Sequence, residues 1–342
     1  MPPAHRSRPP EDRSREHTAP AEHGRVVTLA ALATLVGGAL LSVQSQLNGQ
    51  LSLSWGAPTD AALWSFSSGL VVLTALLLAV PGARRALLSL PGAVRRGELR
   101  WWQCLGGFAG AAYVAVQTYA VPLAGVAVFT IAVVGGQTGN SLLVDRLGLS
   151  PAGHRPVTVG RLLAAAVAVV GVAVAVSGQH GGTGPSVILP AVLAFVVGAC
   201  TTVQQATNGQ VNATSGSSVA TGWLNFATGL CFLVVVALVR LVTAALHSPA
   251  DLSAPWWAWL GGVLGVPFIV ISAVVVQYLG MLLYTLVMLT GQLATAVALD
   301  LVAPTGTQRI GIQVVVGVVI TLLAAYAAAW AAQRRPPAGR PG

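Results

Sequence analysis

The most constraining feature of this sequence is that it contains two copies of one unit. A block of side-chain amides at residues 44–50 recurs 160 positions later, at residues 204–210. Between residues 27 and 70 the two copies are identical at 15 of 44 positions without a gap. Residues 101–145 match a segment 155 positions later at 12 of 45 positions. Shared apolar composition would match some Ala, Val and Leu, whereas matched Gln, Asn, Trp and Asp residues indicate duplication.

Composition assigns the chain to the membrane proteins. Of its 342 residues, 55% are hydrophobic and only 8% are charged, and the mean hydropathy is +0.75. A soluble domain carries about a quarter charged residues. A chain this apolar cannot cover a globule with polar surface. We therefore predict an all-α polytopic membrane protein.

Ten apolar runs are long enough to cross a bilayer as helices, since about 20 residues suffice. They are residues 26–47, 61–80, 101–121, 123–144, 158–176, 186–206, 219–241, 256–276, 278–299 and 310–330. The third and fourth runs are separated only near Pro122, and the eighth and ninth only near Gln277. We therefore expect two tight helical hairpins. The dipeptides Pro81-Gly82 and Pro91-Gly92 are expected to mark turns between the second and third runs.

Five transmembrane helices per copy is an odd number, so the second copy must cross the membrane in the opposite sense. We predict two inverted five-helix repeats, at residues 26–178 and 186–331. The Pro- and Arg-rich segment 1–25 is expected to be a disordered cytoplasmic tail, and residues 332–342 a second cytoplasmic tail.

The arginines fix the predicted orientation. All 18 basic residues are Arg. With the N-terminus inside, 16 of the 18 fall on the inner side, and only Arg240 and Arg309 fall outside. The positive-inside rule then predicts a multi-pass protein of the inner or plasma membrane with both termini cytoplasmic.

Other classes of protein find little support in the sequence. The basic residues occupy tails and loops, so we expect no nucleic-acid partner. The three Cys residues (Cys104, Cys200 and Cys231) form no CxxC pair and are expected to be buried free thiols, and no His pair has ligand spacing. We therefore predict neither a metal nor another cofactor. No set of His, Cys, Ser and carboxylate residues gathers within the runs, so we predict no enzyme activity.

Two motifs carry a family resemblance. The pattern Q-x-x-x-N-G-Q ends the first and sixth runs, and F-x-x-G lies in the run that follows each. The residues concerned are Gln44, Asn48, Gly49, Gln50, Phe66 and Gly69, with Gln204, Asn208, Gly209, Gln210, Phe226 and Gly229. Over residues 26–330 the chain resembles the YdcZ-like branch of the drug/metabolite transporter superfamily. That resemblance implies a ten-helix bundle, alternating access, and efflux of small metabolites or drugs. Small multidrug-resistance relatives carry a Glu in the first transmembrane helix, and this chain does not.

Amide side chains are the candidate substrate pathway. An amide is costly in lipid unless it meets a partner or water, so these residues must face the bundle interior. The predicted pathway residues are Gln44, Asn48, Gln137, Asn140, Gln204, Asn208 and Gln292. Such amides offer donors and acceptors to a neutral or zwitterionic solute. The alternative is that each one only joins helices, by a bond worth about 0.6 kcal/mol.

Depth along the helices suggests two gate layers. At 1.5 Å of rise per residue, Gln44 lies about 28 Å along a helix that begins near Arg25, towards the outer face. We expect Gln44 and Gln292 to form an outer layer. The equivalent inner layer would contain Gln204 and Gln137.

Two carboxylates end equivalent helices, where they oppose the helix dipole. An Arg opens the next run in each copy, so we predict the pairs Asp145–Arg161 and Asp300–Arg309. These pairs would be structural latches or, alternatively, gate locks and proton sites. Thr59 or Asp60 is expected to cap the second helix. Gly106, Gly110 and their equivalents are expected to allow close helix packing.

The sequence as a whole favours a secondary transporter, an exporter of a small neutral, zwitterionic or amphiphilic molecule. Its partners would be that substrate and the lipid bilayer. The sequence leaves open whether the protein forms a homodimer. The alternative is a non-transporting membrane scaffold or sensor that keeps the fold. A transporter needs a central polar cavity lined by both copies, which a scaffold could fill with Leu and Phe.

Overall fold

The structure, a computed structural model, describes residues 19–149, 159–177, 187–243, 252–305 and 311–333. This part of the chain is all-helical and contains no strand. Its elements are α1 (Ala19–Trp55), α2 (Pro58–Ala79), α3 (Pro81–Arg95), η1 (Trp101–Leu105), α4 (Gly107–Arg146), α5 (Val159–Ser177), α6 (Ile188–Ser215), α7 (Ser218–Val242), η2 (Trp256–Leu260), α8 (Gly261–Val302) and α9 (Ile312–Gln333). α1 begins at Ala19, inside the segment expected to be a tail.

The bundle has the composition of a membrane protein in both its surface and its interior. Among the described residues, six helices are long and apolar enough to cross a bilayer, and α5 and α9 contain shorter apolar stretches. Leu and Val side chains cover much of the outside, whereas polar residues such as Asn48 and Gln117 are fully buried. Apolar side chains are stable in contact with lipid, whereas polar groups need hydrogen-bond partners and therefore lie inside the bundle.

α4 folds back on itself, as the predicted hairpin of the third and fourth runs requires. The rings of Tyr113 and Phe129 have centroids 5.4 Å apart. Sixteen residues of straight helix would separate them by about 24 Å. The turn is at Gly125, whose φ of 81° and ψ of 165° are open to glycine and strained for other residues. The break therefore lies three residues beyond the predicted Pro122.

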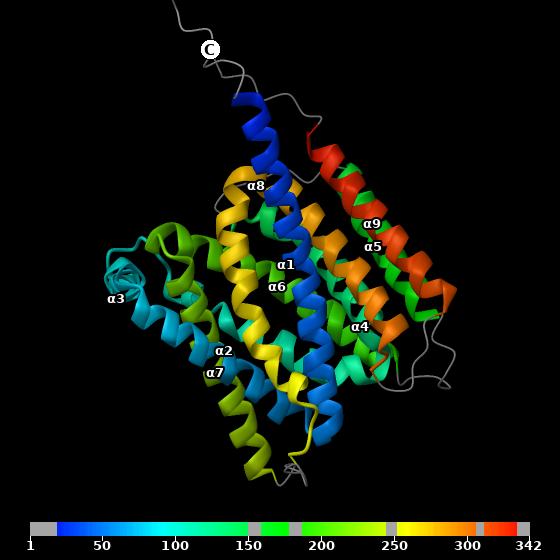
Figure 1. The fold of residues 1–342 in the computed structure, drawn as a ribbon, viewed down its shortest axis with the longest axis horizontal. Coiled ribbons are helices and arrows are strands. Elements are labelled where there is room, and N and C mark those ends of the chain that lie inside the picture. Colours follow the sequence, from blue (N-terminus) through cyan, green and yellow to red (C-terminus); the bar gives the residue numbers. More distant parts are fainter. Residues whose placement is uncertain (1–18, 150–158, 178–186, 244–251, 306–310, 334–342) are drawn as a thin grey trace, which may run out of the picture.

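α8 forms the second hairpin. Figure 1 shows it rising beside α1, turning, and descending towards its C-terminal end. Contacts along α1 agree, because Gly37 packs near Phe268 and Ile271 whereas the adjacent Gly38 packs against Met288. The two arms of α8, which are the parts of the helix before and after its turn, therefore lie against the same turn of α1.

Equivalent residues of the two copies make equivalent contacts. α1 packs most extensively on α8, and α6 on α4; α2 pairs with α7, and α5 lies beside α9 (Figure 1). A Cβ at Gly38 would overlap the Met288 carbonyl oxygen, and one at Gly198 would overlap the carbonyl of Val133. Met288 and Val133 occupy matched positions in the aligned copies. The glycines that were expected to allow close helix packing, Gly106, Gly110 and their equivalents Gly261 and Gly265, lie against amide side chains of the neighbouring helix.

Two local expectations are corrected by the structure. The dipeptides Pro81-Gly82 and Pro91-Gly92 do not mark turns, because α3 begins at Pro81 and includes Pro91. Proline is tolerated at the first helical position, and Pro91 is exposed. Neither Thr59 nor Asp60 caps α2, since the helix begins earlier, at Pro58, with Ala57 at the N-cap and no side-chain cap.

The cysteines are also placed differently from the prediction. All three are free, as expected. Cys104 is half-buried, and Cys200 and Cys231 are exposed on the outside of the bundle. A thiol behaves as a small hydrophobic group, so an apolar run that faces lipid can hold it as well as a protein core can.

Candidate functional site

The amides of α1 face the first arm of α8. Asn48 and Gln44 lie one turn apart on α1, and both are buried. A Cβ at Gly261 would overlap Asn48 Oδ1, and one at Gly265 would lie 3.4 Å from Gln44 Oε1. The two glycines thus leave room for the two amides, which point into the bundle and away from its surface.

The second copy repeats this arrangement on α6. Gln204 and Asn208 face Gly110 and Gly106, the counterparts of Gly265 and Gly261. Asn225 of α7 accepts hydrogen bonds from Gln204 Nε2 at 2.9 Å and from Asn208 Nδ2 at 3.1 Å. This set is half-buried, whereas the α1 set is buried. Each copy therefore holds one amide cluster against the glycines of the other copy.

A buried network extends the α1 cluster into α4. Asn48 Nδ2 donates to Gln117 Oε1 at 2.7 Å, and Gln117 Nε2 donates to Ser45 Oγ at 2.7 Å. The Tyr113 hydroxyl is hydrogen-bonded to Ser45 and Gln117. Gln117 and Tyr113 were not predicted as site residues, because their equivalents in the other copy are Ser272 and Phe268. An amide in the middle of an apolar run was the signal that could have identified Gln117.

The remaining predicted pathway residues join α4 or α8 to their neighbours. Gln137 Nε2 donates to Thr201 Oγ1 at 3.1 Å, and Asn140 Nδ2 donates to the Ala199 carbonyl at 2.7 Å. The backbone carbonyl of Gln292 accepts from Ser42 Oγ at 2.6 Å, and its side chain is buried. Among the described residues, no hydrogen bond joins Gln44 to Gln292 or Gln204 to Gln137, the partners expected in the two gate layers.

Two phenylalanines, one from each copy, meet near the α1 amide cluster. The ring centroids of Phe66 and Phe226 are 5.0 Å apart. A Cβ at Gly265 would lie 3.5 Å from the tip of the Phe226 ring and 3.4 Å from Gln44 Oε1. Phe226, from the second copy, therefore reaches the amide cluster of the first copy.

Asp300 caps the second arm of α4. Its Oδ1 accepts from Val126 N at 2.9 Å and its Oδ2 from Ala127 N at 2.7 Å, and the residue is buried. The break at Gly125 exposes these N–H groups, and a carboxylate suits a helix N-terminus. The predicted partner Arg309 lies outside the described residues, as do the side chains of Asp145 and Arg161. Both predicted ion pairs stay predictions.

Several buried polar atoms have no hydrogen-bond partner among the residues that the structure describes. They include Asn48 Oδ1 and Gln46 Oε1 on α1 and Thr305 Oγ1 just after α8. Each such atom is costly unless a water or a ligand meets it. Within the described ranges, the α1 cluster thus keeps acceptor atoms that no protein donor satisfies.

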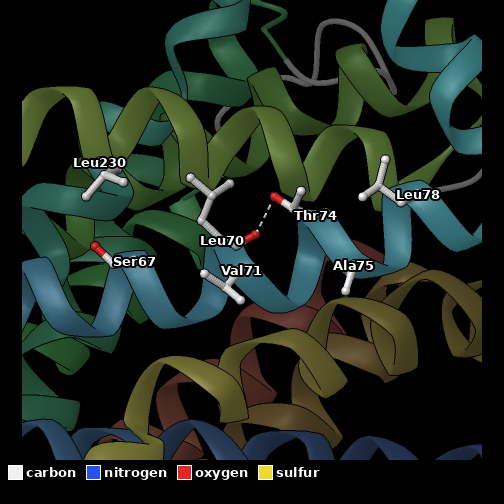
Figure 2. Close-up of a pocket in the computed structure, with 7 residues that line it drawn as sticks. All are labelled: Ser67, Leu70, Val71, Thr74, Ala75, Leu78 and Leu230. Atoms are coloured by element: carbon white, nitrogen blue, oxygen red, sulfur yellow. Dashed lines mark hydrogen bonds between the residues drawn. The ribbon is translucent and has the colours of Figure 1, made fainter.

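The structure also contains a shallow groove of about 480 Å³ along α2 (Figure 2). Ser67, Leu70, Val71, Thr74, Ala75 and Leu78 of α2 and Leu230 of α7 line it. None of the predicted pathway amides is among them. Thr74 turns its hydroxyl back to the Leu70 carbonyl at 2.7 Å, so the groove presents mainly apolar groups.

These observations define a class of protein: a duplicated, all-helical membrane protein with polar side chains enclosed between its two copies. No group of three or more potential metal-ligating side chains occurs within the described ranges. The model of the family described as "Putative inner membrane exporter, YdcZ" matches residues 29–174 and again residues 189–327. The chain belongs to this YdcZ family and is a membrane transporter of the drug/metabolite type.

The fold of this chain is similar to that of a solved structure. A solved structure titled only "Crystal structure of protein" is 18% identical to this chain, with a TM-score of 0.54. The match covers 90% of this chain and 98% of the other. At that identity the likeness concerns the fold alone. The comparison with curated proteins found no match.

Proposed function

We propose that this protein exports a small neutral, zwitterionic or amphiphilic molecule by alternating access. One observation carries the proposal: two equivalent amide clusters, one on α1 and one on α6, each lie against the glycines of the other copy. Family membership supports the direction of transport, since the family is described as inner membrane exporters.

The proposed layout is ten transmembrane helices in two inverted repeats. α4 and α8 would each contribute two, one per arm of the hairpin. The equivalence of the contacts around Gly38 and Gly198 supports a two-fold relation between the copies. Repeat-built transporters hold their substrate where the repeats meet, near the middle of the membrane.

The chemistry of the amide clusters supports the proposed substrate class. Gln and Asn side chains both donate and accept hydrogen bonds and carry no charge. The unpartnered Asn48 Oδ1 would accept from an N–H or O–H group of the solute. The apolar ring faces of Phe66 and Phe226 suit an amphiphilic solute that has one polar end.

In the proposed cycle the two aromatic rings form the barrier between the two sides. Opening on one side would expose the α6 cluster and opening on the other the α1 cluster. The copies would rock against each other at the glycine contacts, where small residues let helices slide at close range. Asp300, which joins α8 to the second arm of α4, would hold these arms together as they move.

The direct test is transport by the purified protein in liposomes. Uptake and efflux of a panel of metabolites would be measured with and without a pH gradient, and with the Asn48→Leu and Asn208→Leu variants. Transport of a neutral or zwitterionic compound, lost in both variants, is the expected result. Movement of no compound across a broad panel would contradict the proposal.

Two observations favour the alternative of a scaffold or sensor. Several of the amides bond to one another or to neighbouring helices, and the groove along α2 is shallow and apolar. A scaffold would use those bonds only for packing. In that case the Asn48→Leu and Asn208→Leu variants would be less stable than the wild type, and the wild-type protein itself would transport none of the compounds in the panel.

The orientation of the protein in the membrane has a separate test. We propose that both termini are cytoplasmic, because 16 of 18 Arg residues then lie on the inner side. Reporter fusions after residue 25, after Arg96 and after residue 333 should all report the cytoplasm. A fusion after residue 333 that reports the outer side would contradict an even number of crossings.

A further inference from the structure

The inference concerns α3, the short helix that follows α2. One of its faces packs on the bundle: Ala83, Leu90 and Ala93 are buried, and Leu90 and Ala93 lie in a cluster with Val211 of α6 and Leu99. The opposite face makes no contact of this kind with the described part of the chain. α3 is therefore docked on the bundle by one side only.

The outward face combines positive charge with one large apolar side chain. Arg84, Arg85 and Arg95 are exposed, and Leu88 lies between them at 79% exposure. Helical spacing places Arg84, Leu88 and Arg95 along one line, at i, i+4 and i+11. Among the described residues, no carboxylate forms a salt bridge with Arg84, Arg85 or Arg95.

Arg96, at the end of α3, is different. Its Nε and Nη2 donate to the two carboxylate oxygens of Glu98 at 2.6 and 3.0 Å. The hydrogen bond from Arg96 lowers the pKa of the Glu98 carboxyl, so this pair stays ionised at neutral pH. Glu98 therefore neutralises Arg96, and the charge of the other three arginines is left for an external partner.

The direction of α3 places this face at the membrane surface. The chain leaves α2 at Ala79, and after Val80 it enters α3 directly. Figure 1 looks down the axis of α3 at the edge of the molecule, whereas α2 runs across the view. If α2 crosses the bilayer, α3 runs roughly along its surface, which is the position of an interfacial amphipathic helix.

We propose that the outward face of α3 is a binding surface for the headgroups of anionic phospholipids in the leaflet where α2 ends. Guanidinium groups bind phosphate oxygens in a bidentate, charge-assisted manner. Leu88 enters the acyl region between the bound headgroups. The surface anchors α2 and α7 at this side of the bilayer, whatever molecule the protein carries.

The test is lipid binding to the full-length protein. Purified, delipidated protein is titrated with phosphatidylglycerol or phosphatidylcholine, and the retained lipids are counted by native mass spectrometry. Each arginine near an anionic surface contributes about fivefold in affinity, the equivalent of about 1 kcal/mol. The triple variant Arg84→Gln/Arg85→Gln/Arg95→Gln should bind phosphatidylglycerol more than tenfold more weakly, and its binding of phosphatidylcholine should be unchanged.

Three controls separate charge on this face from charge elsewhere. The Arg84→Lys/Arg85→Lys/Arg95→Lys variant should keep most of the binding, and Arg96→Gln/Glu98→Gln should keep all of it. Arg334→Gln/Arg335→Gln removes charge from the predicted cytoplasmic tail, and it should weaken phosphatidylglycerol binding less than the triple Gln variant does. Melting temperatures of all variants check that they are folded.

Either of two outcomes would overturn the proposal. Wild-type protein could bind phosphatidylglycerol and phosphatidylcholine with equal affinity. Alternatively, the folded triple Gln variant could bind phosphatidylglycerol as tightly as the wild type does. Neither outcome bears on transport, so this inference fails or survives separately from the proposed function.

Discussion

Phe66 and Phe226 lie against each other where α2 meets α7, with ring centroids 5.0 Å apart and ring planes tilted by 35°. They occupy the same position in the two copies, so one residue of the repeated unit meets its own counterpart. Each ring also fills the space beside the other copy's glycine, Phe226 at Gly69 and Phe66 at Gly229. The contact is therefore a joint between the two halves of the molecule.

The first prediction tests this joint as a barrier. Phe226→Ala removes a buried ring, which should cost about 3–5 kcal/mol of stability. It should also raise the passive leak of small solutes through the protein in liposomes. The matched control is Phe108→Ala, because Phe108 pairs with Phe232 at 5.4 Å but is 40% exposed. An equal leak through both variants would show that the barrier lies elsewhere.

The second prediction concerns the close approach of α1 to α8 and of α6 to α4. Gly38→Ala and Gly198→Ala each place a Cβ into a backbone carbonyl, which cannot move without displacing its helix. Overpacking of this kind costs about 1–3 kcal/mol, so both variants should melt at lower temperature in detergent. Gly139→Ala is the control, because its Cβ would meet only Phe195 Cζ at 3.9 Å. If all three variants have the same melting temperature, close packing at Gly38 and Gly198 contributes little to stability.

The third prediction concerns the cap on the second arm of α4. Asp300→Asn keeps the shape of the side chain but leaves one oxygen to accept from two N–H groups. One buried donor is then unsatisfied, at a cost of about 1–3 kcal/mol, and the melting temperature should fall. Glu98→Gln, which changes an exposed ion pair, should have little effect. An Asp300→Asn protein as stable as the wild type would mean that this cap contributes little to stability.

The fourth prediction tests the buried network in a double-mutant cycle. Gln117→Leu should leave the Asn48 amide without its acceptor and destabilise the protein by about 1–3 kcal/mol. Asn48→Leu should do the same. The double variant should lose less than the sum, with a coupling of about 0.5–3 kcal/mol measured by denaturation in detergent. Additive losses would indicate that the 2.7 Å contact is not a stabilising bond.

Sequence reasoning predicted the hairpins better than the ends of individual helices. Runs of about 20 apolar residues become helices in a bilayer regardless of their neighbours, because each backbone group must bond within its own segment. The break in α4 was expected near Pro122 and lies at Gly125, where the backbone adopts a positive φ. α3 was read as two turns, since its prolines and glycines are typical of turns, and packing against α6 and α7 makes it a helix.

The candidate site was predictable only as a set of residue types. Matched amides in two copies indicated that Gln44, Asn48, Gln204 and Asn208 face inward, and these residues do point into the bundle. Their partners were beyond prediction. Gln117 has no amide counterpart in the other copy, and Asp300 meets Val126 and Ala127, residues that lie more than 170 positions away in the chain.

The sequence by itself determined that this protein is a duplicated helical bundle in a membrane, because apolar length and repeated polar positions are properties of the chain alone. The tertiary structure decided which groups meet: Phe66 with Phe226, Asp300 with the broken end of α4, and Gln117 with Asn48. A side chain's partner depends on where other helices pass, and the folding back of α4 and α8 brings together residues that their positions in the chain keep far apart.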